Sequence, residues 1–329
     1  MGRYFIVVTL LLVSACGRLE SPPSAPPALE AQLVAGQALA WGANAFGQTE
    51  VPPLPAGLRY KALAAGAVHS FGLRSDGQII AWGNYGDLEV PELPAGLRYK
   101  AVAAGGQARG VALRSDGRVV AWDAYGQDEV PALPKGLRYT GVAAGSNHSL
   151  ALRSDGRVIA WGDNSYAQAE VTPLPAGRRY VAVAGGLGHS LALRSDGRIV
   201  AWGDNSDGQI TVPPLPRNVT YVAVAAGSAH SLALTSKGRV VAWGANAQGQ
   251  TIVPPLPTGM TYTAVSGGLD FSLALRSDGQ IIAWGDDANG QLEVPALASG
   301  ERYASLAAGG VHALALTELA QVTARAGRR

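Results

Sequence analysis

The chain has a single cysteine, Cys16, among its 329 residues, so an intramolecular disulfide is excluded. It contains no Gly-x-Ser-x-Gly turn, no phosphate-binding loop and no dinucleotide fingerprint. Its formal net charge is only +2, from 26 basic and 24 acidic residues, which gives no electrostatic reason to expect nucleic-acid binding. These absences favour a protein that is not an enzyme and that needs no cofactor.

Helical periodicity and long apolar runs are also missing. No segment between residues 33 and 317 repeats its apolar residues every 3.6 positions, so helices are not expected there. The apolar stretch Phe5–Val13 is too short for a transmembrane helix. Together with Arg3 and the motif Val13-Ser14-Ala15-Cys16, it resembles the signal of bacterial lipoproteins. That resemblance implies cleavage before Cys16 and a lipid on its thiol, and an ordinary secretory signal is the alternative.

The two ends of the chain are therefore expected to lie outside the folded domain. Residues 1–15 are interpreted as a signal peptide, and residues 16–32 as a lipidated cysteine followed by a Pro/Ser tether. Residues 33–317 form one domain, and residues 318–329 form a disordered basic tail. We expect a monomer in the cell envelope, attached to a membrane through Cys16.

The tryptophans of the sequence are regularly spaced. The seven tryptophans follow one another at spacings of 41, 40, 39, 41, 41 and 41 residues. Such a period is typical of a repeat protein, a propeller or a solenoid. Because each repeat has one tryptophan in the same place, these side chains are expected to pack between repeats. The tryptophans are Trp41, Trp82, Trp122, Trp161, Trp202, Trp243 and Trp284.

The cleanest repeat, Tyr221–Pro254, predicts four antiparallel strands. They are expected at Tyr221–Ala226, His230–Thr235, Arg239–Trp243 and Thr251–Val253. A recurring Arg-Ser-Asp-Gly motif separates the second strand from the third and favours a two-residue type I′ turn. Four strands per repeat match a blade of a β-propeller.

The chain opens on a tryptophan strand and ends on the other half of a repeat. We therefore predict an all-β, seven-bladed propeller in which one blade is completed by strands from both termini, leaving no open edge.

The repeats resemble those of the regulator of chromosome condensation family. The motif Gly-x-x-His-Ser-x-Ala-Leu, followed by Asp-Gly-x-Val-x-Ala-Trp-Gly-x-Asn, carries the resemblance at Gly145–Leu152 with Asp155–Gln168 and at Gly186–Leu193 with Asp196–Gln209. The family's fold is a seven-bladed propeller. The short repeat and its Gly-Gln-x-x-Val-Pro ending are similar to a bacterial branch that includes a secreted β-lactamase inhibitor. The resemblance implies fold and not function.

One rim of the propeller is the better candidate for binding a partner, because its loops differ between blades. After Trp82 and Trp122 the next valine follows at the eighth position, whereas in the other five blades it follows at the tenth. Four consecutive blades add aromatic residues or acids here, and an arginine replaces the repeated histidine in one of them. Aromatic and arginine side chains are frequent anchors of protein interfaces. These residues, the aromatic arc, are Phe46, Tyr85, Asp87, Arg109, Asp123, Tyr125, Asp128 and Tyr166.

Five histidines occupy one repeated position, one per blade. A shared metal is not expected, because ligands must lie about 2 Å from a common ion. Hydrogen bonding to nearby backbone groups is the expected role.

The sequence thus favours a non-catalytic protein-binding propeller. Three alternatives stay open: an inhibitor of a β-lactamase or cell-wall transpeptidase, a guanine-nucleotide exchange activity by family analogy, and a lyase or hydrolase at the channel mouth using Arg109 and Asp123.

Overall fold

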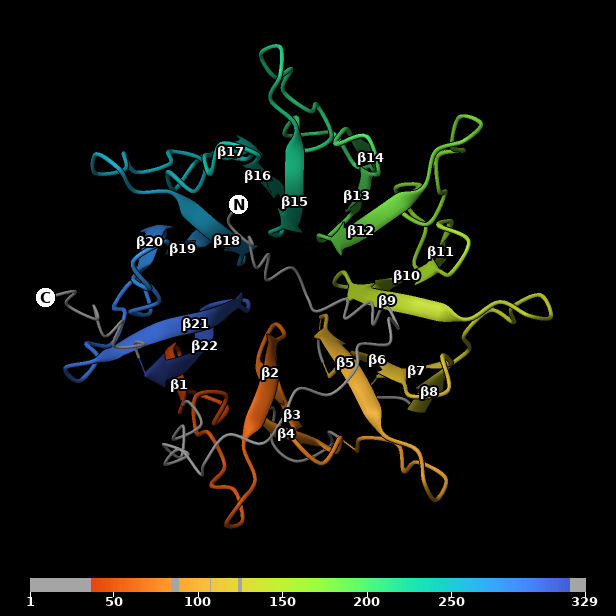
Figure 1. Ribbon diagram of the computed structural model, residues 1–329, viewed down its shortest axis with the longest axis horizontal. Coiled ribbons are helices and arrows are strands. Elements are labelled where there is room, and N and C mark those ends of the chain that lie inside the picture. Colours follow the sequence, from red (N-terminus) through yellow and green to blue (C-terminus); the bar gives the residue numbers. More distant parts are fainter. Residues whose placement is uncertain (1–36, 84–88, 107, 124–125, 320–329) are drawn as a thin grey trace, which may run out of the picture.

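The structure, a computed structural model, describes residues 37–83, 89–106, 108–123 and 126–319. Its strands form seven antiparallel sheets arranged as blades around one axis (Figure 1). The predicted all-β, seven-bladed propeller is thereby confirmed. Within the described residues no helix is long and apolar enough to cross a membrane.

Each blade contains an inner, a middle and an outer strand. The inner strands are β2 (Tyr60–Ala65), β5 (Tyr99–Ala104), β9 (Tyr139–Ala144), β12 (Tyr180–Gly185), β15 (Tyr221–Ala226), β18 (Tyr262–Gly267) and β21 (Glu301–Ala308). The middle strands are β3 (His69–Arg74), β6 (Gly110–Arg114), β10 (His148–Arg153), β13 (His189–Arg194), β16 (His230–Thr235), β19 (Phe271–Arg276) and β22 (His312–Leu319). The outer strands are β4 (Ile79–Gly83), β7 (Val119–Asp123), β11 (Val158–Gly162), β14 (Ile199–Gly203), β17 (Val240–Gly244), β20 (Ile281–Gly285) and β1 (Ala38–Gly42). One blade has a further strand, β8 (Gly126–Asp128).

The last blade is closed by both ends of the domain, as the sequence predicts. β1 pairs with β22 from Ala38↔Leu316 to Gly42↔His312, and β22 pairs with β21 (Figure 1). A backbone hydrogen bond also joins each blade to the next near the axis. These seven bonds are Ala67 N–Gly105 O, Gly106 N–Ser146 O, Ser146 N–Gly186 O, Leu187 N–Ser228 O, Ser228 N–Gly268 O, Leu269 N–Gly310 O and Gly310 N–Gly66 O, at 2.9–3.1 Å. Residues 37–319 therefore complete the ring by themselves.

Two local predictions were wrong. The segment Thr251–Val253 is not a strand, and only the β5–β8 blade has four strands among the described residues. The Asp-Gly turns are not type I′, because only the glycine has positive φ, as at Gly77 (+86°). The N–H of Gly77 donates to Arg74 O (3.0 Å) and that of Arg74 donates to Gln78 O (2.8 Å). This is a type I turn followed by a glycine bulge, a three-residue loop that uses the same dipeptide.

The tryptophans pack between blades, as expected. Trp122 lies against Phe71 of the preceding blade, with ring centroids 5.4 Å apart, and Trp243 shares a cluster with Leu191 and Leu193 of its neighbour. Five indole N–H groups donate to the carbonyl of a glutamine in the preceding blade's loop, at 2.8–2.9 Å. Five of the loops that follow a tryptophan are therefore tied to the next blade.

Candidate functional site

The two rims of the propeller differ in kind. The hairpin rim carries the Asp-Gly turns and the starts of the inner strands. Two hydrogen bonds show that these segments lie together: Ser75 N donates to Arg59 O (2.8 Å), and Tyr99 N donates to Gly77 O (2.8 Å). The Trp-loop rim carries the loops after the outer strands and the loops between inner and middle strands. Asp163 N, just beyond β11, donates to Asn147 O at 2.8 Å, which joins these two kinds of loop.

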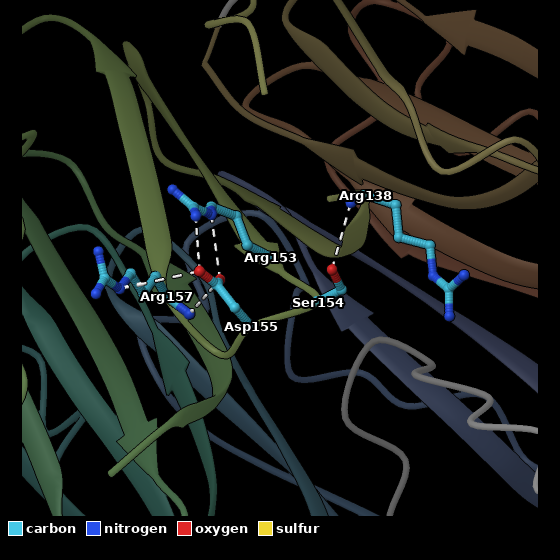
Figure 2. A network of polar contacts seen from close by, with 5 residues as sticks. All are labelled: Arg138, Arg153, Ser154, Asp155 and Arg157. Atoms are coloured by element: carbon cyan, nitrogen blue, oxygen red, sulfur yellow. Dashed lines mark hydrogen bonds and ion pairs between the residues drawn. The ribbon is translucent and has the colours of Figure 1, made fainter. Parts of the chain in front are cut away.

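The arginines beside several Asp-Gly turns are neutralised locally by the turn aspartates. In one turn, Arg153 donates to both carboxylate oxygens of Asp155, at 3.1 and 2.6 Å, and the backbone N–H of Arg157 donates to the same carboxylate at 3.2 Å (Figure 2). Arg138 uses its backbone N–H to reach Ser154 Oγ (3.3 Å), while its guanidinium extends away from Asp155 (Figure 2). The turn arginines are thus structural.

The repeated histidines form hydrogen bonds between blades. Nε2 of His148, His189, His230 and His312 lies 2.8–3.0 Å from the Oγ of a serine in the next blade. The expected backbone partner occurs only for His69, whose Nε2 lies 3.2 Å from Arg109 O. In the part of the chain that the structure describes, no group of three His, Cys, Asp or Glu side chains could hold a metal ion.

Burial keeps these histidines neutral. It lowers the pKa of His69, His148, His189 and His230 from 6.5 to about 4, and that of His312 to about 3. All five side chains are fully buried. They belong to the scaffold, and they are the only histidines of the chain.

Two blades replace the histidine, and each replacement is matched in the next blade. In one of these blades Phe271 occupies the histidine position, and in the next blade Ala313 occupies the position of the partner serine. Neither side chain therefore needs a hydrogen bond. Arg109 stands in the other, and its Nη2 donates to Ser149 Oγ at 2.9 Å. Arg109 is only 7% exposed, so the arginine that the sequence singled out fills an inter-blade position.

Arg109 and Asp123 meet, as one alternative required, but not in a catalytic pocket. They lie beyond the cross-strand pair Gly110↔Trp122, and Arg109 Nη1 is 4.0 Å from Asp123 Oδ2. Arg109 also contacts the next blade through Ser149. The pair therefore replaces the histidine and glycine that face each other in a regular blade, such as His69↔Gly83.

The aspartate also explains the additional strand. In six blades the residue after tryptophan is a glycine with φ near +100°, and a Cβ on Gly162 would lie 2.6 Å from Asn147 O. Asp123 does not have positive φ. The strand can therefore continue and pair back on itself through Trp122↔Gln127 and Ala121↔Asp128. This hairpin replaces the loop that otherwise covers the rim.

Phe46 and Tyr166 occupy equivalent places at the two ends of the aromatic arc. Each donates its backbone N–H to a buried glutamine two residues on, Gln48 or Gln168, at 2.8 Å. The Phe46 side chain is 36% exposed and that of Tyr166 is 57% exposed. The same position holds Asp207, Gln248 and Asn289 in the remaining blades, where the same bond to glutamine forms. The aromatic side chains are therefore not required by the loop.

Backbone strain coincides with the arc. Three non-glycine residues among those described have positive φ: Ala108 (+54°), Ala167 (+64°) and Asn218 (+65°). Asparagine tolerates this region, but for alanine it costs about 1 kcal/mol. Ala108 adjoins Arg109 and Ala167 adjoins Tyr166. Strained residues of this kind concentrate at functional sites.

The remaining members of the arc are Tyr85, Asp87, Tyr125 and Asp128. Tyr85, Asp87 and Tyr125 lie outside the described residues, and Asp128 is placed by its backbone in β8. Trp122 Nε1 has no hydrogen-bond acceptor in the described part of the chain, unlike the five indole N–H groups that donate to a glutamine carbonyl.

Sequence reasoning missed Leu187, which is 50% exposed on the Trp-loop rim. It precedes Gly188, where a Cβ would lie 3.0 Å from the ring of Tyr166. Other blades have alanine, glycine or serine at this position, except for Leu269, so the departure is visible in the sequence. Leu187 extends the exposed apolar surface of Tyr166 toward the axis.

The axial channel offers little chemistry. Its volume is about 310 Å³, and it is lined by inner strands of all seven blades, mainly by alanine, glycine and valine. Lys61 and Lys100 lie at its hairpin-rim end. Arg109 and Asp123 do not line it.

Comparison with known proteins agrees with this architecture. The model of the regulator of chromosome condensation (RCC1) repeat matches residues 139–168, 180–209, 221–250 and 262–291. The chain therefore carries RCC1 repeats and folds as an RCC1-type propeller. The matched segments do not include residues 60–129, the blades with the short loops.

Solved structures of similar fold come from several kinds of organism. Prp20p from Saccharomyces cerevisiae, described with its binding to Gsp1p and histones, has 19% identity and a TM-score of 0.73, covering 88% of this chain and 92% of that one. Human WBSCR16 has 17% identity and a TM-score of 0.70, covering 88% and 100%. The ectodomain of the Physcomitrella patens receptor kinase CR4 has 21% identity and a TM-score of 0.58, covering 77% and 68%. These likenesses concern the fold. No curated protein matches the chain in sequence.

Proposed function

We propose that this chain is a non-catalytic propeller that binds a partner protein on its Trp-loop rim, through the aromatic arc between Phe46 and Tyr166. The observation that carries the proposal is the exposure of these two aromatic side chains at positions where three other blades have polar residues. Exposed aromatic side chains are favoured anchors of protein interfaces.

The blades between these two positions support the same surface. Both have shortened loops, and one contains the Arg109–Asp123 pair and the β7–β8 hairpin. Ala108 and Ala167 hold strained conformations beside Arg109 and Tyr166. Shorter loops between two projecting aromatic residues suit the convex surface of a partner. The Prp20p structure, described with binding to Gsp1p and histones, offers a precedent for partner binding by this fold.

A non-catalytic role agrees with the fate of the candidate reactive groups. The histidines are buried between blades, and Arg109 is engaged with Ser149 and Asp123. The described lining of the axial channel includes Lys61 and Lys100 but no aspartate, glutamate or histidine. A binding function therefore explains the arc better than a lyase or hydrolase does.

Replacing the two exposed aromatic residues should abolish partner capture. The variant Phe46→Ala/Tyr166→Ala loses the anchors but keeps the loops, since Gln48 and Gln168 bond to backbone N–H groups there. We expect at least a tenfold loss of affinity for the captured partner, because an anchor residue contributes about 2 kcal/mol. Affinity is measured by titrating the purified propeller against a partner identified by crosslinking.

The matched control is Gln248→Ala/Asn289→Ala, which alters the equivalent positions in two other blades. It should bind as the unaltered chain does. Equal losses in the two variants would refute the placement of the interface. Assaying the same variants against a β-lactamase and a cell-wall transpeptidase separates inhibition from other modes of partner binding.

The membrane attachment is a second part of the proposal. Its support is the motif Val13–Cys16 after a short apolar stretch, and these residues lie outside the described part of the chain. In a bacterial host, the chain should incorporate labelled palmitate, and Cys16→Ser should remove the label and release the protein from the membrane fraction. Label that persists in Cys16→Ser, or an unlabelled native chain, would refute the attachment.

A further inference from the structure

The near-neutral chain hides a strong separation of charge between its two rims. Between residues 37 and 319, every lysine and arginine except Arg109 belongs to the hairpin rim. These residues are Arg59, Lys61, Arg74, Arg98, Lys100, Arg114, Arg118, Lys135, Arg138, Arg153, Arg157, Arg178, Arg179, Arg194, Arg198, Arg217, Lys237, Arg239, Arg276 and Arg302. Net charge alone, which the sequence shows as almost zero, therefore misses a basic face.

On the hairpin rim, lysines and arginines outnumber aspartates and glutamates by more than two to one. They are Asp76, Glu92, Asp116, Asp155, Asp196, Asp278, Glu301 and Glu318. The opposite rim is acidic, with only Arg109 as a cation. Its described acids are Glu50, Glu89, Asp123, Glu129, Asp163, Glu170, Asp204, Asp207, Asp270, Asp286, Asp287 and Glu293. The propeller is thus a disc with one basic and one acidic face.

The excess of positive charge lies in five consecutive blades and is available to solvent. Arg59, Lys61, Arg98, Lys100 and Arg138 are exposed, and no acidic side chain pairs with them in the described part of the chain. By contrast, Arg276 pairs with Asp278 and Arg302 pairs with Glu318 (2.7 Å). Acidic side chains of the chain itself therefore neutralise the turn arginines and the β18 and β21 blades. They leave the other cations of the basic face without a partner carboxylate.

Both ends of the described domain leave from this face. The backbone of Gln37 exchanges hydrogen bonds with Thr317, at 2.9 and 3.1 Å, and Arg302↔Glu318 is the neighbouring pair. The segment that carries Cys16 is thus joined to the propeller at the basic rim.

We infer that the hairpin rim docks on an anionic phospholipid surface and turns the aromatic arc away from it. Cations spread over a planar rim suit a flat array of lipid phosphates, and such residues bind anionic membranes additively. Val181 and Leu319, each 41% exposed on this rim, add apolar contact. The orientation rests on the proposed lipid at Cys16, whereas the affinity of the face for lipid does not.

The test uses the chain from residue 17 onward, which has neither signal segment nor cysteine but keeps the complete ring. Its cosedimentation is measured with phosphatidylglycerol vesicles and with phosphatidylcholine vesicles, at low and high salt. We expect binding to the anionic vesicles alone, and its loss at high salt, because exposed charges are screened. Equal binding to both vesicles, or binding to neither, would overturn the inference.

Two charge-matched variants locate the contact. Arg59→Gln/Arg98→Gln removes two unpaired cations, and Arg302→Gln/Arg276→Gln removes two paired ones. The first should lower the vesicle partition coefficient about tenfold, and the second less than threefold. Equal losses would indicate a net-charge effect and contradict docking by this face. Tighter binding of the unaltered chain to duplex DNA than to vesicles would assign the face to nucleic acid and overturn the proposal.

The vesicle result and the Cys16 result are separable. Binding of the unlipidated chain reports only on the face, and palmitate labelling reports only on the anchor. Failure of either leaves the other outcome readable.

Discussion

Mild acid should destabilise this propeller strongly. All five histidines of the chain are buried, with pKa values lowered to about 4 or about 3. The unfolded chain binds protons on them below pH ~6.5, whereas the folded chain stays unprotonated to pH ~4. The contribution of the neutral, buried histidines to the free energy of unfolding is therefore fully present above pH ~6.5 and is lost as the pH falls toward ~4. Each histidine contributes about 1.4 kcal/mol per pH unit.

The measurement is the free energy of unfolding in urea between pH 7.5 and pH 4.5, values chosen to bracket the unperturbed histidine pKa of ~6.5. Five protons taken up on unfolding give a slope of several kcal/mol per pH unit. A flat profile would mean that the histidines are not neutral and buried. The chain itself supplies the matched variant, because Phe271 and Ala313 already replace one His–Ser pair. His230→Phe/Ser272→Ala should therefore fold. Its slope should be lower by the contribution of one histidine, about 1.4 kcal/mol per pH unit.

Removing β1 should have the second large effect. A chain that starts at residue 44 lacks the strand that pairs with β22 and lacks Trp41, which is 6% exposed and packs 6.5 Å from Tyr303 between ring centroids. The loss of a buried tryptophan alone costs about 3–5 kcal/mol. The uncovered edge of β22 offers unpaired backbone groups to another chain. We expect a lower urea midpoint and association into oligomers.

The control for this deletion is a chain that starts at residue 37, which retains β1 complete. It should match the longer chain in midpoint and stay monomeric by light scattering. If the chain starting at residue 44 were equally stable and monomeric, closure of the last blade by both termini would be unimportant, contrary to the ladder between Ala38 and Gly42.

The sequence predicts the ring because each blade repeats the same short-range pattern. Tryptophan spacing, alternating apolar residues and Asp-Gly turns are local signals, and together they fix seven antiparallel sheets and their closure. The type of turn was predicted wrongly because Asp-Gly suits both a type I′ turn and a glycine bulge. The fourth strand was predicted wrongly because extended, proline-flanked residues such as Thr251–Val253 need a ladder partner to become a strand.

The sequence singles out the candidate residues but not the contacts that they make. Phe46, Tyr166, Arg109 and Asp123 stand out as departures from the repeat, and departures can be read from sequence. The bond from Arg109 to Ser149 joins residues one repeat apart, so it depends on how neighbouring blades meet. The same holds for the charged rims, because alternate loops of a meander gather residues that are scattered along the chain.

The separation of charge between the two rims suggests how the propeller is oriented when it binds its partner. A basic rim on lipid would present the acidic rim, with Phe46 and Tyr166, to proteins in the surrounding space. A partner of the aromatic arc should accordingly carry a basic surface around an apolar pocket, since complementary charges favour encounter.

Site-specific photocrosslinking tests the central claim most directly. A photoreactive amino acid is placed singly at Phe46, Tyr166, Gln248 and Asn289 in the full-length chain. These are four equivalent loop positions on one rim. The account predicts the same partner adduct from Phe46 and Tyr166, and none from Gln248 and Asn289. Adducts of equal yield from all four positions, or from Gln248 and Asn289 alone, would contradict it.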